Sequence, residues 1–400
     1  MECKISIIIP VFNVQDYIKE ALESIVRQTI GFEHLEVILV NDCSTDRSGE
    51  IIDEYASKYD NFKAIHLPEN SGYAGKPRNI GINEASGKYL MFLDPDDYYE
   101  DDACETLYNK IVEEDVDIVF GRYYYILNGK RLNRKSFSPF KDGEIKVNSI
   151  DEDKRLFKTS PSVWTKIVKK SFIEENNITF LEGMPGQDAV FVVNMFLKAE
   201  GIVYLQNYFP YNYRIRDSNE DMSVSHNRNK NNLMGMVSAY YALFDILKDN
   251  KKEEYFPIIF GNHLPFWMRN FILSSADYGE KRELLEYAGP LFEEFKKYGA
   301  DLNIKYLIQL FNFIAGKKYD EAIIIAEILS DFIEKQNQLE NRLDAKGIQA
   351  ADLIKKQKQL ETRLDARKKQ VAELQTTLGW LEYKIKNIGQ RLKRKMSYVL

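Results

Sequence analysis

The sequence contains little cysteine and no long apolar run. Its three cysteines, Cys3, Cys43 and Cys104, are too few for a disulfide framework and lack zinc-site spacing, which favours a reducing, cytoplasmic compartment. No stretch reaches the ~18 apolar residues that a transmembrane helix needs. With 11 prolines and 21 glycines in 400 residues, the chain is neither collagen-like nor a low-complexity disordered protein. We therefore expect a packed protein of several domains.

Several common catalytic signatures are also absent. The chain has no G-x-x-x-x-G-K-[ST] phosphate loop, no G-x-G-x-x-G dinucleotide fingerprint and no G-x-S-x-G nucleophile motif. Its four histidines show no metal-ligand spacing. These absences weaken the usual nucleotide hydrolase, dinucleotide-dependent and serine hydrolase interpretations.

Charge is unevenly distributed along the chain. The formal net charge is −6, from 55 basic and 61 acidic residues, but residues 329–400 hold 16 basic and 9 acidic side chains. The first 328 residues are therefore strongly acidic, and we expect no nucleic-acid partner. The basic end after Trp380 is compatible with a solvated helix end and with an amphipathic helix on anionic lipid, peripheral at the inner face of the membrane.

The first 125 residues alternate between strand and helix patterns. Apolar runs predict strands at residues 5–11, 35–40, 62–67, 89–93 and 116–125, and helical spacing predicts helices at 14–28, about 46–59, 77–85 and 102–113. This alternation predicts an α/β fold with a mostly parallel sheet flanked by helices. Right-handed crossovers would bring the carboxyl ends of the strands to one edge, where such sheets bind ligands.

The rest of the chain divides into two further regions. We expect a first domain over 1–228 and, from its helical periodicity, a helical domain over 229–328. From Leu329 onward a heptad pattern places apolar residues at 15 of 19 seam positions, and the octapeptide QLENRLDA recurs as QLETRLDA 21 residues later. Residues 329–400 are therefore predicted to form a coiled coil that assembles a homo-oligomer. A long solvated helix folded back on its own protein is the alternative.

The strongest chemical signal follows the predicted strand at 89–93. Asp94, Asp96 and Asp97 lie within four residues. Carboxylates this close repel one another unless a cation neutralises them. Mg²⁺ and Mn²⁺ prefer oxygen ligands and are often completed by substrate phosphates, so the cluster predicts a divalent metal beside a diphosphate. A D-x-D pattern alone is weak evidence, because an N-cap for the helix near Asp102 would also explain it.

A predicted loop and helix start supply cations. The segment SGYAGKPRN places Lys76 and Arg78 beside a helix N-terminus, an arrangement that suits phosphate oxygens. A surface turn with solvated charges is the alternative. Together with the acidic cluster, the segment favours a site for a phosphorylated ligand.

Three motifs carry a family resemblance. Taken in order, ISIIIPVFN, VILVNDCSTDRS and ENSGYAGKPRNIGINEASGKYLMFLDPDD resemble the donor-binding half of family 2 glycosyltransferases with the GT-A fold, and the likeness covers residues 3–225. The GKPRN variant resembles bacterial enzymes that glycosylate wall teichoic acid or related surface polymers. The resemblance implies a metal-dependent, inverting transferase that moves a sugar from a UDP-sugar to a hydroxyl of a polymer or lipid-linked glycan acceptor.

The resemblance also implies roles for individual residues on the donor side. The nucleoside pocket would comprise Pro10, Val11, Asn13 and Asp42, with Asp42 on the uracil edge. The ribose and diphosphate would lie by Asn70, Lys76 and Arg78, and Arg216 would contact the diphosphate. Asp94 would meet the ribose or the metal, Asp96 would hold Mn²⁺ or Mg²⁺, and Asp97 would lie near the donor sugar. For Arg216, a simple surface loop is the alternative.

On the acceptor side the resemblance points to Asp188. In this family the base that takes the acceptor proton is usually the Asp of a Glu-Asp pair, and the matching segment here, GMPGQD, ends in Asp188. Gln187 stands in place of the Glu, which removes a neighbouring charge. A helix N-cap is the alternative role for Asp188. Trp164 and Lys166 resemble an acceptor-side element, with a core Trp as the alternative.

Two other functions compete with a glycosyltransferase. A sugar-nucleotide nucleotidyltransferase would need a Gly- and Arg-rich loop after the first strand, which PVFNVQDYI lacks. A non-catalytic oligomeric scaffold that retains the fold would have no use for the acidic side chains of the predicted site. Metal-dependent binding of UDP would separate an enzyme from such a scaffold.

Overall fold

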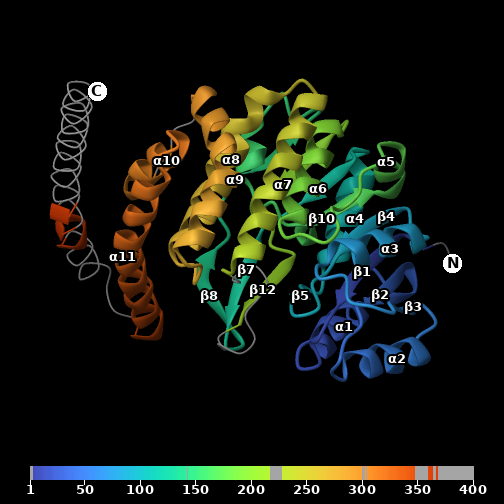
Figure 1. Ribbon diagram of the computed structural model, residues 1–400. Coiled ribbons are helices and arrows are strands. Elements are labelled where there is room, and N and C mark those ends of the chain that lie inside the picture. Colours follow the sequence, from blue (N-terminus) through green and yellow to red (C-terminus); the bar gives the residue numbers. More distant parts are fainter. Residues whose placement is uncertain are drawn as a thin grey trace, which may run out of the picture. The chain divides into compact units, whose positions relative to one another are not determined.

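The computed structural model describes residues 3–141, 143–216, 228–299, 302, 304–346, 359–363 and 366–367. It divides into two compact units, residues 1–323 and 324–400. The first unit contains both sheets and most of the helices (Figure 1). This unit holds the predicted first domain, 1–228, together with residues 229–323 of the predicted helical domain, 229–328.

The main sheet has eight strands in the order β3-β2-β1-β4-β10-β6-β11-β9. The bounds are β1 Ile5–Val11, β2 Leu35–Asn41, β3 Phe62–His66, β4 Tyr89–Phe92, β6 Ile118–Phe120, β9 Glu144–Val147, β10 Lys166–Lys169 and β11 Ile202–Leu205. β1 pairs in parallel with β2 and with β4. It is buried along its whole length, which explains its continuous apolar sequence.

The sheet is mixed, although four of its seven strand pairings are parallel and only β10 and β9 run against the other strands. β10 lies antiparallel between β4 and β6, and β9 pairs antiparallel with β11. Both antiparallel strands come from the mixed region after residue 126, where the sequence has no regular strand–helix alternation. The predicted α/β class is confirmed.

The predicted strand over 116–125 is two strands in two sheets. β6 ends at Phe120, and the chain then enters β7 of a second sheet, whose order is β5-β12-β7-β8. The bounds here are β5 Tyr98–Tyr99, β7 Tyr123–Leu127, β8 Lys130–Lys135 and β12 Tyr211–Ile215. At Gly121, between β6 and β7, a Cβ atom would come within 2.6 Å of Pro210 Cδ. Only glycine allows the chain to pass this close.

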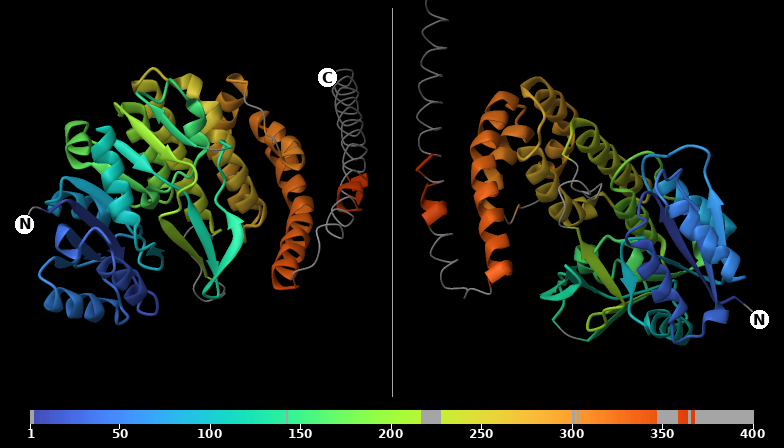
Figure 2. Two further views of the ribbon diagram at one scale, coloured as in Figure 1. Left: turned by 180° about the vertical axis from the view of Figure 1, so that it is seen from behind. Right: turned by 90° about the horizontal axis from the view of Figure 1, so that it is seen from below.

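Helices pack on both faces of the main sheet (Figures 1 and 2). The bounds are α1 Ile18–Val26, α2 Ser48–Lys58, α3 Gly75–Glu84, α4 Ala103–Glu114, α5 Lys170–Glu175 and α6 Gln187–Lys198. Because side chains alternate along a strand, Ile5, Ile7 and Ile9 of β1 share a buried cluster with α1 and α4, whereas Ile8 faces α3. A Cβ atom at Gly81 of α3 would meet Ile8 at 2.3 Å, so this glycine lets α3 lie close on β1.

The predicted helical region is confirmed as helical. It contains α7 Lys230–Asp249, α8 Phe256–Ile272, α9 Tyr278–Lys297 and α10 Ile308–Ala315. Asp277 and Glu280 form a capping box at the start of α9. Trp267 is fully buried, and its Nε1–H donates to the Leu233 carbonyl at 3.1 Å, which ties α8 to α7. α7 packs against α6, which carries the predicted base.

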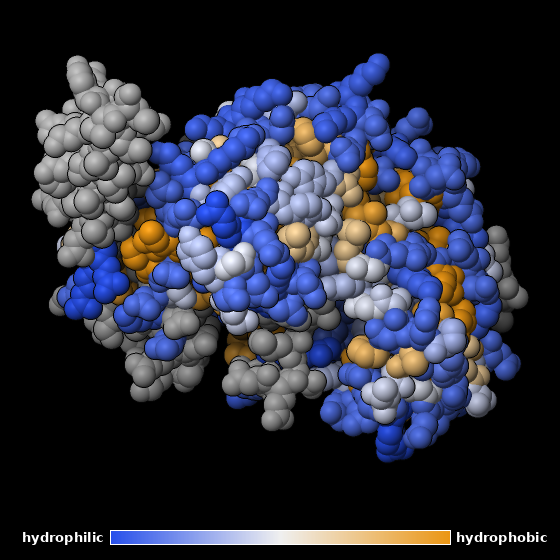
Figure 3. Space-filling view, viewed as in Figure 1, coloured by the Kyte–Doolittle hydropathy of each residue, from blue (hydrophilic) through white to orange (hydrophobic). Residues whose placement is uncertain are grey.

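The predicted coiled coil is not confirmed. α11, Tyr319–Lys346, is helical across the first heptads from Leu329, and residues 359–363 are helical, but most of the seam and the basic end after Trp380 lie outside the described residues. Among the helices that the structure describes, none combines the length and apolar character of a membrane span. Hydrophilic residues cover most of the face shown in Figure 3, with apolar residues between them.

Candidate functional site

Three strand ends meet at one edge of the main sheet, as the parallel order predicts. The Asp42 N–H donates to the Val11 carbonyl at 2.8 Å, and the Leu93 N–H donates to the Ile8 carbonyl at 3.1 Å. The segments that follow β1, β2 and β4 therefore start side by side. This places Asp42 and the acidic cluster after β4 along the same edge.

The predicted nucleoside side is built by the segments after β1 and β2. Asn13 Oδ1 accepts the Thr45 N–H at 2.8 Å, and the Asn13 N–H donates to Ser44 Oγ at 3.1 Å. Asn13 is exposed and has φ 48°, a left-handed conformation that Asn tolerates well. Pro10 and Val11 are buried within β1 and shape this edge from inside the sheet.

Asp42 organises the loop that follows β3. Its buried carboxylate accepts the Ser71 N–H at 2.8 Å, the Ser71 hydroxyl at 2.9 Å and the Asn70 amide at 3.3 Å. A carboxylate has about four lone-pair positions, so these bonds leave room for one more donor. The contact of Asp42 with uracil stays a prediction, and the remaining lone-pair position would accommodate it.

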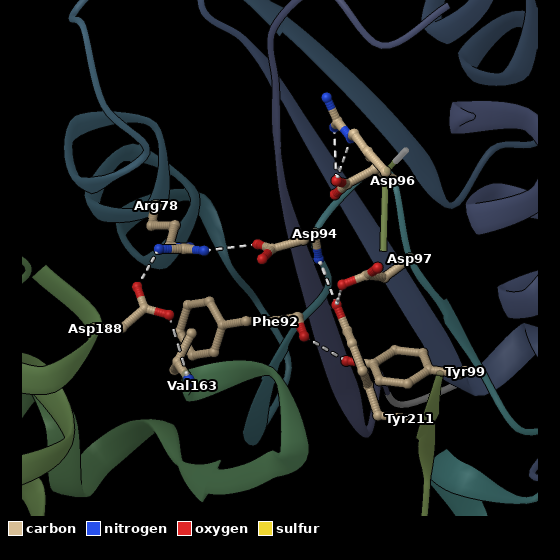
Figure 4. Close-up of polar contacts among 10 residues, drawn as sticks. Arg78, Phe92, Asp94, Asp96, Asp97, Tyr99, Val163, Asp188 and Tyr211 are labelled. Carbon is tan, nitrogen blue, oxygen red and sulfur yellow. Dashed lines mark hydrogen bonds and ion pairs between the residues drawn. The ribbon is translucent and has the colours of Figure 1, made fainter. Parts of the chain in front are cut away.

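Arg78 joins two carboxylates at the centre of the site (Figure 4). Its Nη2 donates to Asp94 Oδ1 at 2.7 Å and its Nη1 to Asp188 Oδ1 at 2.5 Å. Arg78 is only 3% exposed, and its Nε has no hydrogen-bond partner in the described part of the chain. The guanidinium therefore brings together the segment after β4 and the start of α6.

This arrangement changes which cation is available to a phosphate. Arg78 is expected at the diphosphate, but in the structure both of its terminal nitrogens bind carboxylates. Lys76 is half-buried in the first turn of α3 and has no ion-pair partner among the described residues. Lys76 is thus the better placed of the two for a phosphate contact.

The acidic residues after β4 lie in unequal environments. Burial raises the pKa of Asp94 to about 6, with the Asp188 and Asp96 charges adding to the effect and the Arg78 guanidinium opposing it. Burial likewise raises the pKa of Asp97 well above its ordinary value, and Asp96 and Asp94 add to that shift. A cation bound at this edge would relieve the repulsion.

Asp97 faces into the protein. Its carboxylate accepts the Tyr211 hydroxyl at 2.8 Å and the Arg214 N–H at 2.7 Å, and the same Tyr211 oxygen accepts the Asp94 N–H at 3.3 Å. These bonds fix β12 to the segment after β4. The contact of Asp97 with a donor sugar stays a prediction, because this carboxylate is 1% exposed here. The sequence does not identify Tyr211 and Arg214 as site residues, since neither lies in a recognisable local motif.

Asp96 pairs with Arg216, two residues that the resemblance places at the metal and the diphosphate. Arg216 Nη2 lies 2.6 Å from Asp96 Oδ2, and Nε donates to the same oxygen at 2.8 Å. Arg214 Nε donates to the Asp96 carbonyl at 2.8 Å. The part of the chain that the structure describes holds no group of three or more His, Cys, Asp or Glu side chains placed for a metal ion.

Asp188 lies in the first turn of α6, with its carboxylate turned back toward the strand ends. The N-cap position belongs to Gly186, which has φ 79°, so the N-cap alternative for Asp188 does not hold. Asp188 Oδ2 lies 3.5 Å from the Val163 N–H, a long hydrogen bond. Gln187 is buried against the start of α3, where a Cβ atom at Gly75 would approach its Oε1 at 2.6 Å.

Trp164 and Lys166 are both buried. Trp164 is 5% exposed and stacks on Tyr211 with ring centroids 4.0 Å apart. Lys166 Nζ donates to the Ser162 carbonyl at 2.6 Å and the Ser160 carbonyl at 3.1 Å, and burial lowers the pKa of this amine to about 7. Lys166 thus fixes the loop that leads to Val163, whose N–H contacts Asp188.

Comparison with known proteins gives a consistent family. The family model "Glycosyl transferase family 2" matches residues 6–169. The glycosyltransferase GlyG of Streptococcus pneumoniae serotype 4 is 32% identical over 219 residues, which cover 53% of this chain and 71% of that protein. The poly(ribitol-phosphate) beta-glucosyltransferase of Bacillus spizizenii is 36% identical over 265 residues, 66% of this chain and 40% of that protein. The chain thus spans less than half the length of that larger relative.

A solved structure extends the likeness to the fold. Residues 1–349 of Staphylococcus aureus TarS, in complex with UDP-GlcNAc, match with a TM-score of 0.65 and 25% identity, covering 81% of this chain and 90% of that one. The GT-A-like arrangement of a mixed sheet and flanking helices is therefore confirmed. The family resemblance that the sequence motifs carry is confirmed as well.

Proposed function

The chain belongs to glycosyl transferase family 2, and from that premise we propose that it moves a sugar from a UDP-sugar to a hydroxyl of a teichoic-acid-like or other cell-surface polymer. The observation that supports this best is Asp188 held opposite the acidic strand end by Arg78. A transferase needs a base on one side and a diphosphate site on the other, and the two carboxylates sit on these two sides. The match to a structure with bound UDP-GlcNAc supports the choice of a UDP-sugar.

Asp188 is the residue that we assign as the base. Arg78 fixes the orientation of this carboxylate, while the long contact with Val163 leaves Oδ2 able to accept an acceptor hydroxyl proton. As the hydroxyl oxygen attacks the anomeric carbon, its proton passes to Asp188 and the bond to UDP breaks. A single displacement of this kind inverts the anomeric centre, and the beta-linked product in the name of the Bacillus spizizenii relative supports that outcome.

The residues of the acidic edge fit a divalent ion. Mg²⁺ and Mn²⁺ sites on nucleotides commonly use one or two carboxylates together with substrate phosphates and water. Asp96 is partly exposed and Asp94 is its neighbour; burial raises the pKa of Asp94 and Asp97, and the charges of the neighbouring carboxylates add to both shifts. Asp96, with Asp94, would hold the ion, which when bound would stabilise the charge of the departing diphosphate. Arg216 and Lys76 would contact the phosphates from the protein side.

Two expectations from the sequence stay predictions. Assembly of a homo-oligomer through the heptads and contact of the basic end with an anionic membrane rest on residues that lie mostly outside those described. A cytoplasmic protein peripheral to the membrane would meet a lipid-linked acceptor, so the two expectations are compatible with the proposed acceptor.

The proposal is tested by donor turnover and by calorimetry with UDP and Mn²⁺. We expect the full chain to release UDP from at least one of UDP-glucose, UDP-galactose, UDP-GlcNAc and UDP-GalNAc, and to lose that activity on chelation. Asp96→Ala should abolish metal-dependent UDP binding while the circular dichroism spectrum is retained. Unchanged turnover in that variant with all divalent metal chelated would contradict the assignment, and no metal-dependent heat in the wild type would favour the scaffold.

A further inference from the structure

Three tyrosine rings form a cluster on the second sheet, beside the site. Tyr123 and Tyr125 come from one face of β7, and Tyr213, opposite Tyr125 in the register, comes from β12. Their ring centroids are 5.1 Å apart for Tyr123 and Tyr125 and 5.9 Å for each pair with Tyr213. All three are half-buried, so part of each side chain is accessible.

Trp164 supports this cluster from below the surface. Its buried ring lies 4.8 Å from that of Tyr123 and stacks on Tyr213 at 5.8 Å with planes 12° apart. Such contacts hold aromatic rings in fixed orientations. The three tyrosines therefore present a preformed aromatic surface.

A row of hydroxyl groups continues from the tyrosines to the base. The Tyr123 and Tyr125 hydroxyls are 3.1 Å apart, and the Ser160 and Ser162 hydroxyls are 2.7 Å apart. Burial raises the pKa of Tyr123, and the Ser160 side chain lies close enough to oppose that rise, so the two pairs are neighbours. We call these four residues and Tyr213 the tyrosine–serine row.

The row runs between the two halves of the site. Its serines lie in the loop that Lys166 fixes, and Val163 of the same loop contacts Asp188. At the other end, Tyr213 lies near the acidic residues after β4: burial raises the pKa of Tyr213, and the charges of Asp97, Asp96 and Asp94 add to that shift. A ligand on this row would therefore reach Asp188 without covering the predicted nucleoside side.

We propose that the tyrosine–serine row is the acceptor subsite and binds the uncharged, polyhydroxylated part of the acceptor. This inference rests on the proposed function. Hydroxyl groups both donate and accept hydrogen bonds, which suits a ligand that carries a hydroxyl on successive carbons. Aromatic faces cover the C–H groups of such a ligand, while the hydroxyl rims stay hydrogen-bonded. The ligand chemistry is shared by open-chain polyols and by sugar rings.

The test measures binding and turnover in the full chain. Tyr125→Phe and Ser160→Ala remove one hydroxyl each, Ser160→Thr retains it, and Tyr124→Phe is the matched control. Tyr124 lies on the opposite face of β7, stacked on Phe209 at 4.6 Å. Calorimetry with UDP present uses poly(ribitol phosphate) as the polyol and a β-linked glucose oligosaccharide as the sugar, and kinetics separate the acceptor KM from the donor KM.

We expect Tyr125→Phe and Ser160→Ala to weaken binding of one probe and to raise the acceptor KM roughly tenfold, as loss of a hydrogen bond predicts. The donor KM and UDP binding should not change, and Tyr124→Phe and Ser160→Thr should behave as wild type. Unchanged binding of both probes in the two variants, or no binding of either probe by a wild type that does turn over UDP-sugar, would overturn the inference. A wild type that neither binds UDP nor turns over a UDP-sugar would instead refute the proposed function.

Discussion

At the residue scale, the charge balance around Arg78 determines what each neighbouring side chain can do. One buried guanidinium faces two carboxylates, so the cluster of Arg78, Asp94 and Asp188 is short of one positive charge. Removing Arg78 would leave two carboxylates together without compensation, whereas removing one acid leaves a balanced pair. Substitutions in this cluster should therefore differ in severity according to the charge that they leave behind.

Replacement of Asp188, the proposed base, tests that balance without loss of the fold. We expect Asp188→Asn to lower the rate of sugar transfer by on the order of 10²–10⁴, because the general base is lost while Arg78 keeps Asp94. UDP binding should persist, and Glu200→Gln, an exposed acid just beyond α6, should have no effect. Undiminished transfer by Asp188→Asn would remove Asp188 as the base.

Lys166 predicts a pH dependence of stability. Burial lowers the pKa of this amine from 10.5 to about 7, so above pH 7 the unfolded chain binds a proton here that the folded chain does not. Its contribution to stability is complete above about pH 10.5 and is lost as the pH falls toward 7. Between pH 7.5 and 9.5, Lys166→Met should lower the slope of the unfolding free energy by ~1.4 kcal/mol per pH unit, measured by urea denaturation. Equal slopes in the wild type and in Lys166→Met would show that the pKa of this amine is not lowered.

At the element scale, the approach of α3 to β1 depends on small residues. Gly81 lies against Ile8, and Gly75 lies against the Leu181 carbonyl, where a Cβ atom would come within 2.0 Å. Because α3 also carries Lys76 and Arg78, its distance from the sheet sets where these cations lie. Packing in this layer is thus coupled to the geometry of the site.

A pair of glycine substitutions separates packing from backbone entropy. Gly81→Ala should lower the unfolding free energy by about 1–3 kcal/mol, since the added methyl group would overlap Ile8. Gly261→Ala in α8, where no atom lies within 4 Å of the added Cβ, should raise it by about 0.5–1 kcal/mol. Chemical denaturation of both variants measures the two effects. A change in unfolding free energy of the same sign in both variants would refute the packing explanation.

The sequence predicted the elements whose signals are local. β1, β2 and β4 are continuous apolar runs because they are buried on both faces, and the acidic residues after β4 follow directly from that position. β10 is a four-residue strand, KIVK, with a lysine at each end, and its place between β4 and β6 depends on pairing with distant segments. The contact of Tyr211 with Asp97 and that of Arg78 with Asp188 could not be predicted from local sequence either, because each joins residues far apart in the chain.

At the scale of the whole molecule, the sheets and the heptad region are organised differently. The first unit buries a core between layers, whereas the heptad pattern from Leu329 onward predicts an apolar seam that would pack on a partner helix. A catalytic unit joined to such a segment would act as one of several linked copies. Linked copies on one polymer would gain from a high effective concentration.

Seam substitutions test the assembly. Leu378→Lys combined with Leu381→Lys places charges at adjacent a and d positions. In sedimentation velocity the wild type should have the mass of an oligomer and the double variant that of a single chain. Thr376→Lys, outside the seam in the preceding heptad, should leave the mass unchanged. A wild type that sediments as a single chain would refute the predicted coiled coil.

One strand, β12, contributes to both of the proposed substrate regions. Tyr211 and Arg214 bind Asp97, Arg216 binds Asp96, and Tyr213 belongs to the tyrosine–serine row. A displacement of β12 when one ligand arrives would therefore alter the surface offered to the other. Thermodynamic reciprocity then requires that donor and acceptor change each other's affinity by the same factor, so that the strength of this coupling would depend on how far β12 moves.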